Sequence, residues 1–169
     1  MLSERELAFI ALHKDNYPRV YKFVQRRVND PELAQELAAD VFRVAWQKQD
    51  ETVEVAVTWL LTIARNLIGN AYRSRERQQA LQDKLKHNAR IHSVADDGNA
   101  AIQDAMDALR DKDRDVLQLA YWDALTMAEI AAVLGCSESA AKVRLHRARS
   151  AFRKLLPAST ESVTQKMGA

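Results

Sequence analysis

Glycine, proline and cysteine are all scarce in this sequence. Its 169 residues include four glycines, three prolines and one cysteine. An all-β chain of this length needs many tight turns and would normally use more glycine and proline. The single cysteine, Cys136, excludes an internal disulfide and a multi-cysteine zinc site. This cysteine usage fits a reducing compartment, so we expect the protein in the cytoplasm.

Other features are missing as well. No apolar run approaches the roughly 18 residues that predict a membrane span. Residues 1–6 carry acids and are followed by no apolar segment, which argues against a signal peptide. The four histidines fit no metal-ligand spacing, the four glycines form no phosphate-binding loop, and no residue lies in a recognisable nucleophile context. We therefore expect that the protein is not an enzyme and that it binds no cofactor and no metal.

The net charge of +2 conceals an uneven distribution of charge. Residues 140–156 contain six bases and no acid, and residues 65–77 contain four bases and one acid. Residues 101–115 contain five acids and three bases. A basic segment can be an ordinary solvated helix face, or it can contact an anionic partner such as nucleic acid. Charge by itself leaves both interpretations open.

Apolar residues recur at helical spacing through most of the chain. The pattern predicts helices over about 15–28, 31–47 and 57–77, and further helices after residue 102. Asp30-Pro31 suits the N-cap and first position of the second helix. The residues expected to face the core of the first half are Tyr17, Val20, Tyr21, Val24, Val28, Leu33, Leu37, Val41, Val44, Ala45, Leu60, Ile63, Ala64, Leu67 and Ala71.

The fold class follows from these patterns: all-α, with two small helical domains joined by a flexible linker. Residues 93–99 have the composition of a turn or linker. We expect domains at 1–77 and 101–157, a linker at 78–100 and a polar tail at 158–169. Gly69 lies inside a predicted helix, where glycine costs about 1 kcal/mol relative to alanine, so it is expected to mark close packing.

The second half contains the pattern of a helix-turn-helix. Thr126 and Glu129 have the spacing of a capping box, in which each side chain bonds the other residue's backbone amide. Gly135 suits the end of the short helix that follows, and Ser137 suits the N-cap of a second helix. Two helices joined by so short a turn must cross at a steep angle, as in DNA-reading units of this kind.

The second helix of this unit separates apolar from basic residues. At about 100° per residue, one stripe contains Ala141, Leu145, Ala148, Phe152 and Leu155. The side chains expected to project roughly opposite and meet base edges are Lys142, Val143, His146 and Arg147. Those expected on the flanks, placed for phosphates, are Arg144, Arg149, Arg153 and Lys154. For His146 taken alone, the pattern favours a solvated surface imidazole.

Four stretches carry a family resemblance. Residues 124–135 (ALTMAEIAAVLG) and 141–149 (AKVRLHRAR) resemble the C-terminal DNA-binding domain of bacterial extracytoplasmic-function (ECF) sigma factors. Residues 36–46 (ELAADVFRVAW) and 58–67 (TWLLTIARNL) resemble the other domain of the same family. The stretches occur in family order, and the resemblance extends over about 15–156.

The resemblance implies a dissociable subunit that directs RNA polymerase core to promoter DNA. The front domain would bind the clamp helices of the largest polymerase subunit through Glu36 and Asp40. It would also open the minus-ten element and receive an unstacked base on one side of the third helix, together with the 48–56 loop. The residues implied on that side are Thr62, Asn66, Asn70 and Arg73. The rear domain would read the minus-thirty-five element as duplex, and most relatives are controlled by an anti-sigma protein.

The chain departs from the family pattern at four positions. Asn70 stands where the family often has aspartate, and Ala39 where it has glutamine. Arg110 replaces a favoured proline, and Ala141 replaces a β-branched residue. The first two changes fall on the surfaces that the resemblance assigns to the minus-ten element and the clamp.

Other interpretations stay open at this point. Glu36 and Asp40 share a helix face and repel each other, which suggests an external basic partner, although a solvated face would look the same. A stand-alone helix-turn-helix regulator that binds an operator as a dimer would explain the rear domain and leave the front domain without a role. Phosphorylation, for example at Thr52, is an alternative mode of control.

Overall fold

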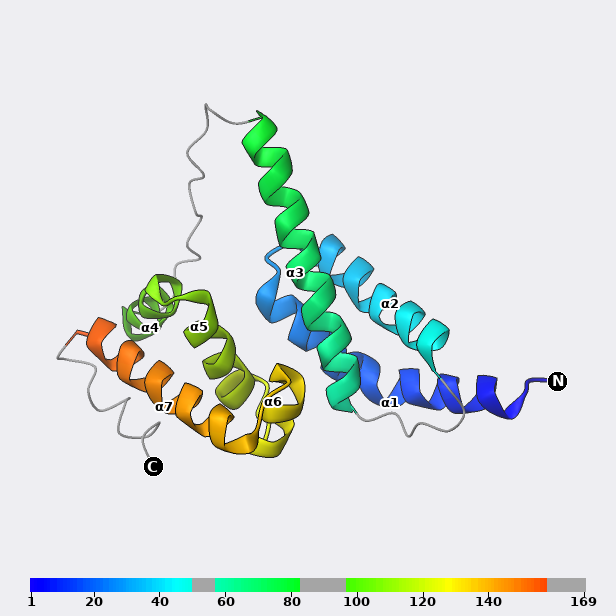
Figure 1. The fold of residues 1–169 in the computed structure, drawn as a ribbon. Coiled ribbons are helices and arrows are strands. Elements are labelled where there is room, and N and C mark those ends of the chain that lie inside the picture. Colours follow the sequence, from blue (N-terminus) through cyan, green and yellow to red (C-terminus); the bar gives the residue numbers. More distant parts are fainter. Residues whose placement is uncertain (50–56, 83–96, 158–169) are drawn as a thin grey trace. The chain divides into compact units, whose positions relative to one another are not determined.

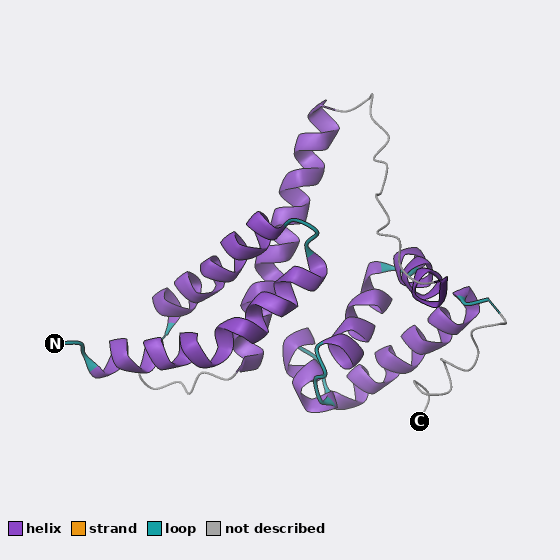
Figure 2. Ribbon diagram, turned by 180° about the vertical axis from the view of Figure 1, so that it is seen from behind, coloured by secondary structure: helices purple, strands orange, loops and turns teal. Residues whose placement is uncertain are grey.

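The protein is all-helical in the part described by the computed structural model, which covers residues 1–49, 57–82 and 97–157 (Figure 1). Figure 2 shows helices joined by short loops throughout these ranges. The chain divides into two compact units, Met1–His87 and Asn88–Ala169. Most of the predicted 48–56 loop, most of the predicted linker and the predicted tail lie outside the described residues, as does Thr52.

The first unit is a bundle of three mutually packed helices: α1 (Glu4–Arg27), α2 (Pro31–Lys48) and α3 (Val57–Gln82). Each helix contributes one apolar face to a common core, and burial of these faces stabilises the bundle. The side chains buried to 1% exposure or less are Val20, Phe23, Val24, Ala34, Ala38, Val41, Ala45, Leu60, Leu61 and Ala64.

Asp30 joins two of these helices. Its carboxylate accepts hydrogen bonds from the backbone N–H groups of Glu32 (3.1 Å) and Leu33 (3.3 Å), which confirms the predicted N-cap. It also pairs with Arg75 of α3 at 3.0 Å. The Leu33 amide, together with the Arg75 guanidinium, lowers the pKa of this carboxyl below its ordinary value.

The helices of both units are longer than the apolar periodicity predicts. The first begins at Glu4, because Ser3 and Glu6 form a capping box with distances of 2.7 and 3.2 Å. This first part exposes Leu7 and Ile10 and so lacks a clear buried stripe. The third continues past residue 77 to Gln82, and α4 (Asp97–Ala108) begins before residue 102. The ends added to α3 and α4 contain few large apolar residues, whereas the first part of α1 is rich in apolar residues that are exposed or only half-buried.

The buried face of α3 differs from the predicted one. Leu61 and Ile68 are buried, at 1% and 6% exposure, whereas Leu67 and Ala71 are only half-buried. The reason is that α3 packs against both α1 and α2, which widens its buried sector. The expectation that Gly69 marks close packing is wrong, because a Cβ built there would lie 3.6 Å from the Arg73 guanidinium, an ordinary contact.

The second unit packs α7 (Glu138–Leu155) against α4, α5 (Asp111–Leu117) and α6 (Met127–Leu134). A π-helical turn, η1 (Gln118–Trp122), follows α5 directly. The core of this unit contains Val116, Leu117, Leu119, Ile130, Ala141, Ala148 and Phe152, each at 2% exposure or less. Arg114 holds the end of α4, since its guanidinium donates to the carbonyls of Met106, Asp107 and Leu109 at 2.7–2.9 Å.

The structure confirms the two helices of the predicted helix-turn-helix and the residues that cap them. The Thr126 hydroxyl accepts from the Glu129 N–H at 3.2 Å, and the Glu129 carboxylate accepts from the Thr126 N–H at 3.0 Å. Gly135 ends α6 in the left-handed conformation with φ 68°, and Ser137 caps α7 by accepting from the Ala140 N–H at 3.1 Å. These local bonds fix the end of α6 and the start of α7, two helices that pack against each other.

The turn before α6 is strained. Ala124 has φ 54°, a left-handed conformation that disfavours any residue with a Cβ. It follows η1, and the two features together carry the chain from α5 to the start of α6. Strain of this kind persists only where the surrounding structure enforces it.

We expect Ala124→Gly to stabilise the second unit. Removing the Cβ relieves the left-handed strain, which outweighs the added flexibility of the unfolded chain, for a net gain of about 0.5–1 kcal/mol. Thermal or urea unfolding followed by circular dichroism measures the difference.

Gly135→Ala is the matched control, because Gly135 has a similar φ of 68° and a Cβ added to it would meet no atom within 4 Å. The free energy of unfolding of this variant is expected to fall by about 1 kcal/mol, because alanine disfavours the left-handed backbone conformation. The interpretation of the Ala124 turn would be contradicted if Ala124→Gly were less stable than the wild type while Gly135→Ala had the stability of the wild type.

Candidate nucleic-acid and protein interfaces

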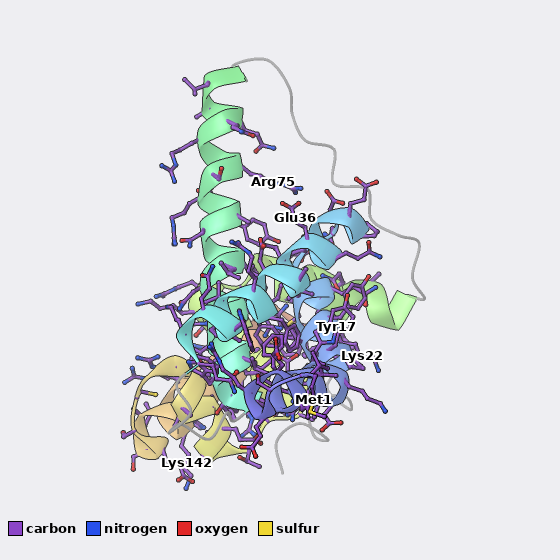
Figure 3. All side chains as sticks on the ribbon, turned by 90° about the vertical axis from the view of Figure 1, so that its right-hand side faces the viewer. Met1, Tyr17, Lys22, Glu36, Arg75 and Lys142 are labelled. Atoms are coloured by element: carbon purple, nitrogen blue, oxygen red, sulfur yellow. The ribbon has the colours of Figure 1, made fainter. Side chains whose placement is uncertain are left out.

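The outward face of α7 presents the predicted base-contacting residues. Lys142, Val143, His146 and Arg147 are all exposed, and Val143 is unusual as an apolar side chain with 49% exposure. The opposite stripe is buried at Ala141, Leu145, Ala148 and Phe152. Leu155, expected in that stripe, is 44% exposed because it lies in the last turn, beyond the core. Figure 3 labels Lys142 near the start of this helix.

The flanking bases of α7 are not equivalent. Arg144, Arg153 and Lys154 are exposed, as expected for side chains that could reach phosphates. Arg149 is half-buried instead, and its Nε–H donates to the Tyr121 hydroxyl at 2.5 Å. Its guanidinium carbon also lies 5.6 Å from the centre of the Tyr121 ring. Sequence patterns missed this contact, because it joins residues 28 positions apart through the π-helical turn.

The predicted polar residues of α3 lie along one side of a continuous helix. Thr62, Asn66, Asn70 and Arg73 follow at intervals of four, four and three residues, and the last three are exposed. The Thr62 hydroxyl donates to the Thr58 carbonyl at 2.7 Å. The Asn70 side-chain oxygen accepts from the Arg73 guanidinium at 2.5 Å. An amide and a cation are therefore held side by side on this face.

The predicted acidic pair lies on the outer side of α2, where Figure 3 labels Glu36. Glu36 is exposed, and the Asp40 side chain is 31% exposed. Asp40 also pairs with Arg43 at 3.0 Å, which reduces the mutual repulsion of the two acids. The i,i+3 spacing of Asp40 and Arg43 could have revealed this ion pair from the sequence. At this degree of exposure the pair adds little stability.

An apolar pocket of about 430 Å³ lies beside this acidic face. Phe9 and Trp46 meet edge to face with ring centres 5.0 Å apart. Arg5 donates to the Trp46 carbonyl at 2.8 Å and lies over the same indole ring. The lining residues are Leu2, Glu6, Phe9, Ile10, Phe42, Arg43 and Trp46. Arg43 therefore touches both the acidic face and the pocket.

Metal binding and membrane insertion find no support in the described ranges. Among the residues that the structure describes, no group of three or more histidine, cysteine or acidic side chains could hold a metal ion. No helix within those same ranges is long and apolar enough to span a bilayer.

Comparison with known families assigns both units. Residues 12–78 match the family of sigma-70 region 2, and residues 99–152 match the family of sigma-70 region 4. The three-helix unit and the helix-turn-helix unit are therefore the two domains of a sigma-70 type transcription initiation factor.

Similar proteins narrow the class further. The chain is 30% identical over 154 residues to the ECF RNA polymerase sigma factor SigL of Mycobacterium tuberculosis, covering 86% of this chain and 87% of that one. It is 29% identical over 160 residues to SigK of Mycolicibacterium vanbaalenii, covering 88% and 82%. The chain belongs to the ECF RNA polymerase sigma factors.

Two solved structures share the fold. One is the sigma factor RpoE from Bartonella quintana, solved with the anti-sigma factor NepR, with a TM-score of 0.66, 24% identity and coverage of 88% of this chain and 96% of that one. The other is CnrH, solved with the cytosolic domain of CnrY, with a TM-score of 0.64, 23% identity and coverage of 88% and 86%.

Family membership decides which class of protein this is. The chain is a transcription initiation factor and not an enzyme, and region 4 is its DNA-binding helix-turn-helix. The alternative of a stand-alone operator-binding regulator is wrong, because the front unit matches sigma region 2.

Proposed function

We propose that the first unit of this sigma factor binds the RNA polymerase clamp and the minus-ten element, while the second reads the minus-thirty-five element. The observation that supports this most directly is the separation of charge: an acidic pair on the outer side of α2, and exposed bases on α7 opposite a buried stripe. Acidic side chains suit a basic protein surface, and bases suit DNA. We also propose that the factor acts in the cytoplasm, where its polymerase works.

The α7 helix is proposed to read duplex DNA in the major groove. Lys142, Val143, His146 and Arg147 lie on its exposed face, within the part of the helix that a helix-turn-helix brings to base edges. An exposed valine at 49% is suited to contact a thymine methyl group. Arg144 and Arg153 are exposed on the flanks of the helix and are proposed to contact phosphates. Arg149 lies between them in the sequence and contacts Tyr121.

The α3 face is proposed to hold an unstacked base of the minus-ten element. Asn66 and Asn70 offer amide donors and acceptors for a base edge, and Arg73 offers a cation for the backbone. No group here has to perform chemistry, because capture of the separated strand favours the open state. The neighbouring residues 50–56, also expected at this site, lie outside the described ranges.

Glu36 and Asp40 are proposed to contact basic residues of the clamp helices of the largest polymerase subunit. Both lie on the outer side of α2, whose other side is occupied by the core. The ion pair between Arg43 and Asp40 is exposed and weak, so Asp40 could also pair with a cation of the partner, with or without loss of its contact to Arg43.

An anti-sigma protein is proposed as a further partner. The support is that two structures of the same fold were solved with NepR and with the cytosolic domain of CnrY.

For the functional division of the chain we retain domains at 1–77 and 101–157, with a linker at 78–100 and a tail at 158–169. The linker so defined includes the last residues of α3, which ends at Gln82, and the first residues of α4, which begins at Asp97.

Reversing both acids, Glu36→Lys with Asp40→Lys, is expected to abolish binding to RNA polymerase core. Like charges would then face each other across the interface, at a cost of several kcal/mol. Co-elution of the two proteins on a sizing column measures the effect.

Asp15→Lys with Asp104→Lys is the control for this test. It changes the net charge equally, at two exposed positions on α1 and α4, and should leave co-elution unchanged. Normal binding of core by the Glu36/Asp40 reversal, in a protein that is still folded, would refute the clamp assignment.

Arg147→Ala is expected to weaken binding to the minus-thirty-five element by about 1–3 kcal/mol and to reduce discrimination against a mutated element. Fluorescence anisotropy of the holoenzyme on both DNA sequences measures this. Arg144→Ala, a change on the flank, should weaken both complexes alike. If Arg147→Ala keeps full discrimination, the residue does not read a base.

Asn66→Ala with Asn70→Ala is expected to slow promoter opening, because two hydrogen-bonding groups for the captured base are lost, at about 1–3 kcal/mol in total. Permanganate reactivity of unpaired thymines in the minus-ten element reports opening. Gln78→Ala, exposed further along α3, is the control. Opening at the normal rate by the double variant would exclude this face as the base-binding site.

A further inference from the structure

Arg149 of α7 is held by a residue outside the helix-turn-helix. Its Nε–H donates to the Tyr121 hydroxyl at 2.5 Å, and its guanidinium carbon lies 5.6 Å from the ring centre. Both side chains are half-buried. The contact therefore fixes a long cationic side chain at the edge of the recognition helix.

The contact uses one edge of the guanidinium and leaves the other edge for a further acceptor. An arginine carries its donors in a planar fork that matches phosphate geometry. Holding Nε fixes the plane of this fork, so the two terminal amino groups point in a defined direction. A phosphate can then bind without first ordering a long, flexible side chain.

The position of Arg149 on α7 suits a phosphate contact. Lys142 lies two turns before it, and Arg153 lies one turn after it, on the same side of the helix. Both neighbours are exposed. The three bases form a row spaced by roughly 10 and 6 Å along the helix axis, which starts at Lys142 on the face proposed to enter the major groove.

The backbone that carries Tyr121 is irregular. Tyr121 lies within the π-helical turn η1, and the strained Ala124 follows three residues later. Isolated π-helical turns are frequent at functional sites, and strained backbone persists only where surrounding structure enforces it. Here the irregular segment places a tyrosine from one helix against the recognition helix.

We propose that Tyr121 is a positioning residue for DNA binding, which aims the Arg149 guanidinium at a phosphate of the minus-thirty-five element. The inference rests on the proposed function of α7. Tyr121 itself is not expected to touch DNA, and its whole effect should pass through Arg149.

Tyr121→Phe tests this inference, because it removes the hydroxyl and keeps the ring. The assay uses holoenzyme made with the full chain and measures affinity for a promoter fragment over a series of salt concentrations. Phosphate ethylation interference on the same fragment locates the contact. We expect Tyr121→Phe to weaken binding about 3- to 10-fold and Arg149→Ala to weaken it more. Arg149→Ala should also reduce the log–log salt slope by about one contact.

A double-mutant comparison separates positioning from general stability. Tyr121→Phe added to Arg149→Ala should cause no further loss of DNA affinity, since the proposal assigns the effect of the hydroxyl on DNA binding to that arginine. Added to Arg153→Ala, a change on the same flank one turn further along, the loss should be additive. Ethylation of one phosphate should interfere with the wild type and no longer with Arg149→Ala.

The outcomes distinguish the inference from the function on which it rests. If wild-type holoenzyme shows no preference for the promoter fragment, the proposed function of α7 fails. If the wild type is specific but folded Tyr121→Phe binds with unchanged affinity, the positioning role is overturned. If folded Arg149→Ala keeps the full salt slope, the pair is merely structural. Arg149→Lys keeps the charge without the fork, so it provides the test if Tyr121→Phe fails to fold, and wild-type binding by that variant would also overturn the proposal.

Discussion

Burial of one apolar stripe on α7 determines which residues the second unit can offer to a partner. Ala141, Ala148 and Phe152 are almost completely inaccessible to solvent, and two of them are alanines that allow neighbouring helices to approach closely. A helix held this tightly cannot rotate without exposing its stripe and opening cavities in the core. The bases on the other side are therefore presented in a fixed direction, which DNA recognition requires.

The same constraint operates in the first unit, with a different distribution of exposed groups. Up to residue 71 the α3 helix is packed on two neighbours, so in that part only a narrow polar side remains exposed, and Asn66 and Asn70 lie on it. The α2 helix buries the side that carries Val41 and Ala45 and exposes Glu36. The proposed function uses this difference in charge: within a chain of net charge +2, the acidic side of α2 is assigned to a protein partner and the basic side of α7 to DNA.

Several polar contacts orient side chains on these surfaces and add little to the stability of the fold. Asp40 shares its charge with Arg43, while Asn70 bonds Arg73 and Tyr121 bonds Arg149. Exposed ion pairs such as the first contribute at most about 1 kcal/mol each. The consequence of all three contacts is orientation: each restricts a long side chain on a surface where a partner is expected, and so reduces the entropy lost on binding.

Much of the architecture could be predicted from local patterns. Helix formation, the caps at Asp30, Thr126 and Ser137, the turn at Gly135 and the alternation of buried and exposed residues along α7 all depend on neighbours within four positions, whose physics is readable in the chain. The motifs that resemble ECF sigma factors were equally local. The added ends of α1, α3 and α4 were missed because they carry no clear buried apolar stripe.

What only the tertiary structure decided depends on residues far apart in the sequence. The wider buried sector of α3, with Leu61 and Ile68 inside, follows from packing on two helices at once. The contact of Arg149 with Tyr121 needs both a π-helical turn and the docking of α7 on α5. Periodicity describes one helix at a time, and it contains no information about which neighbour a side chain will meet.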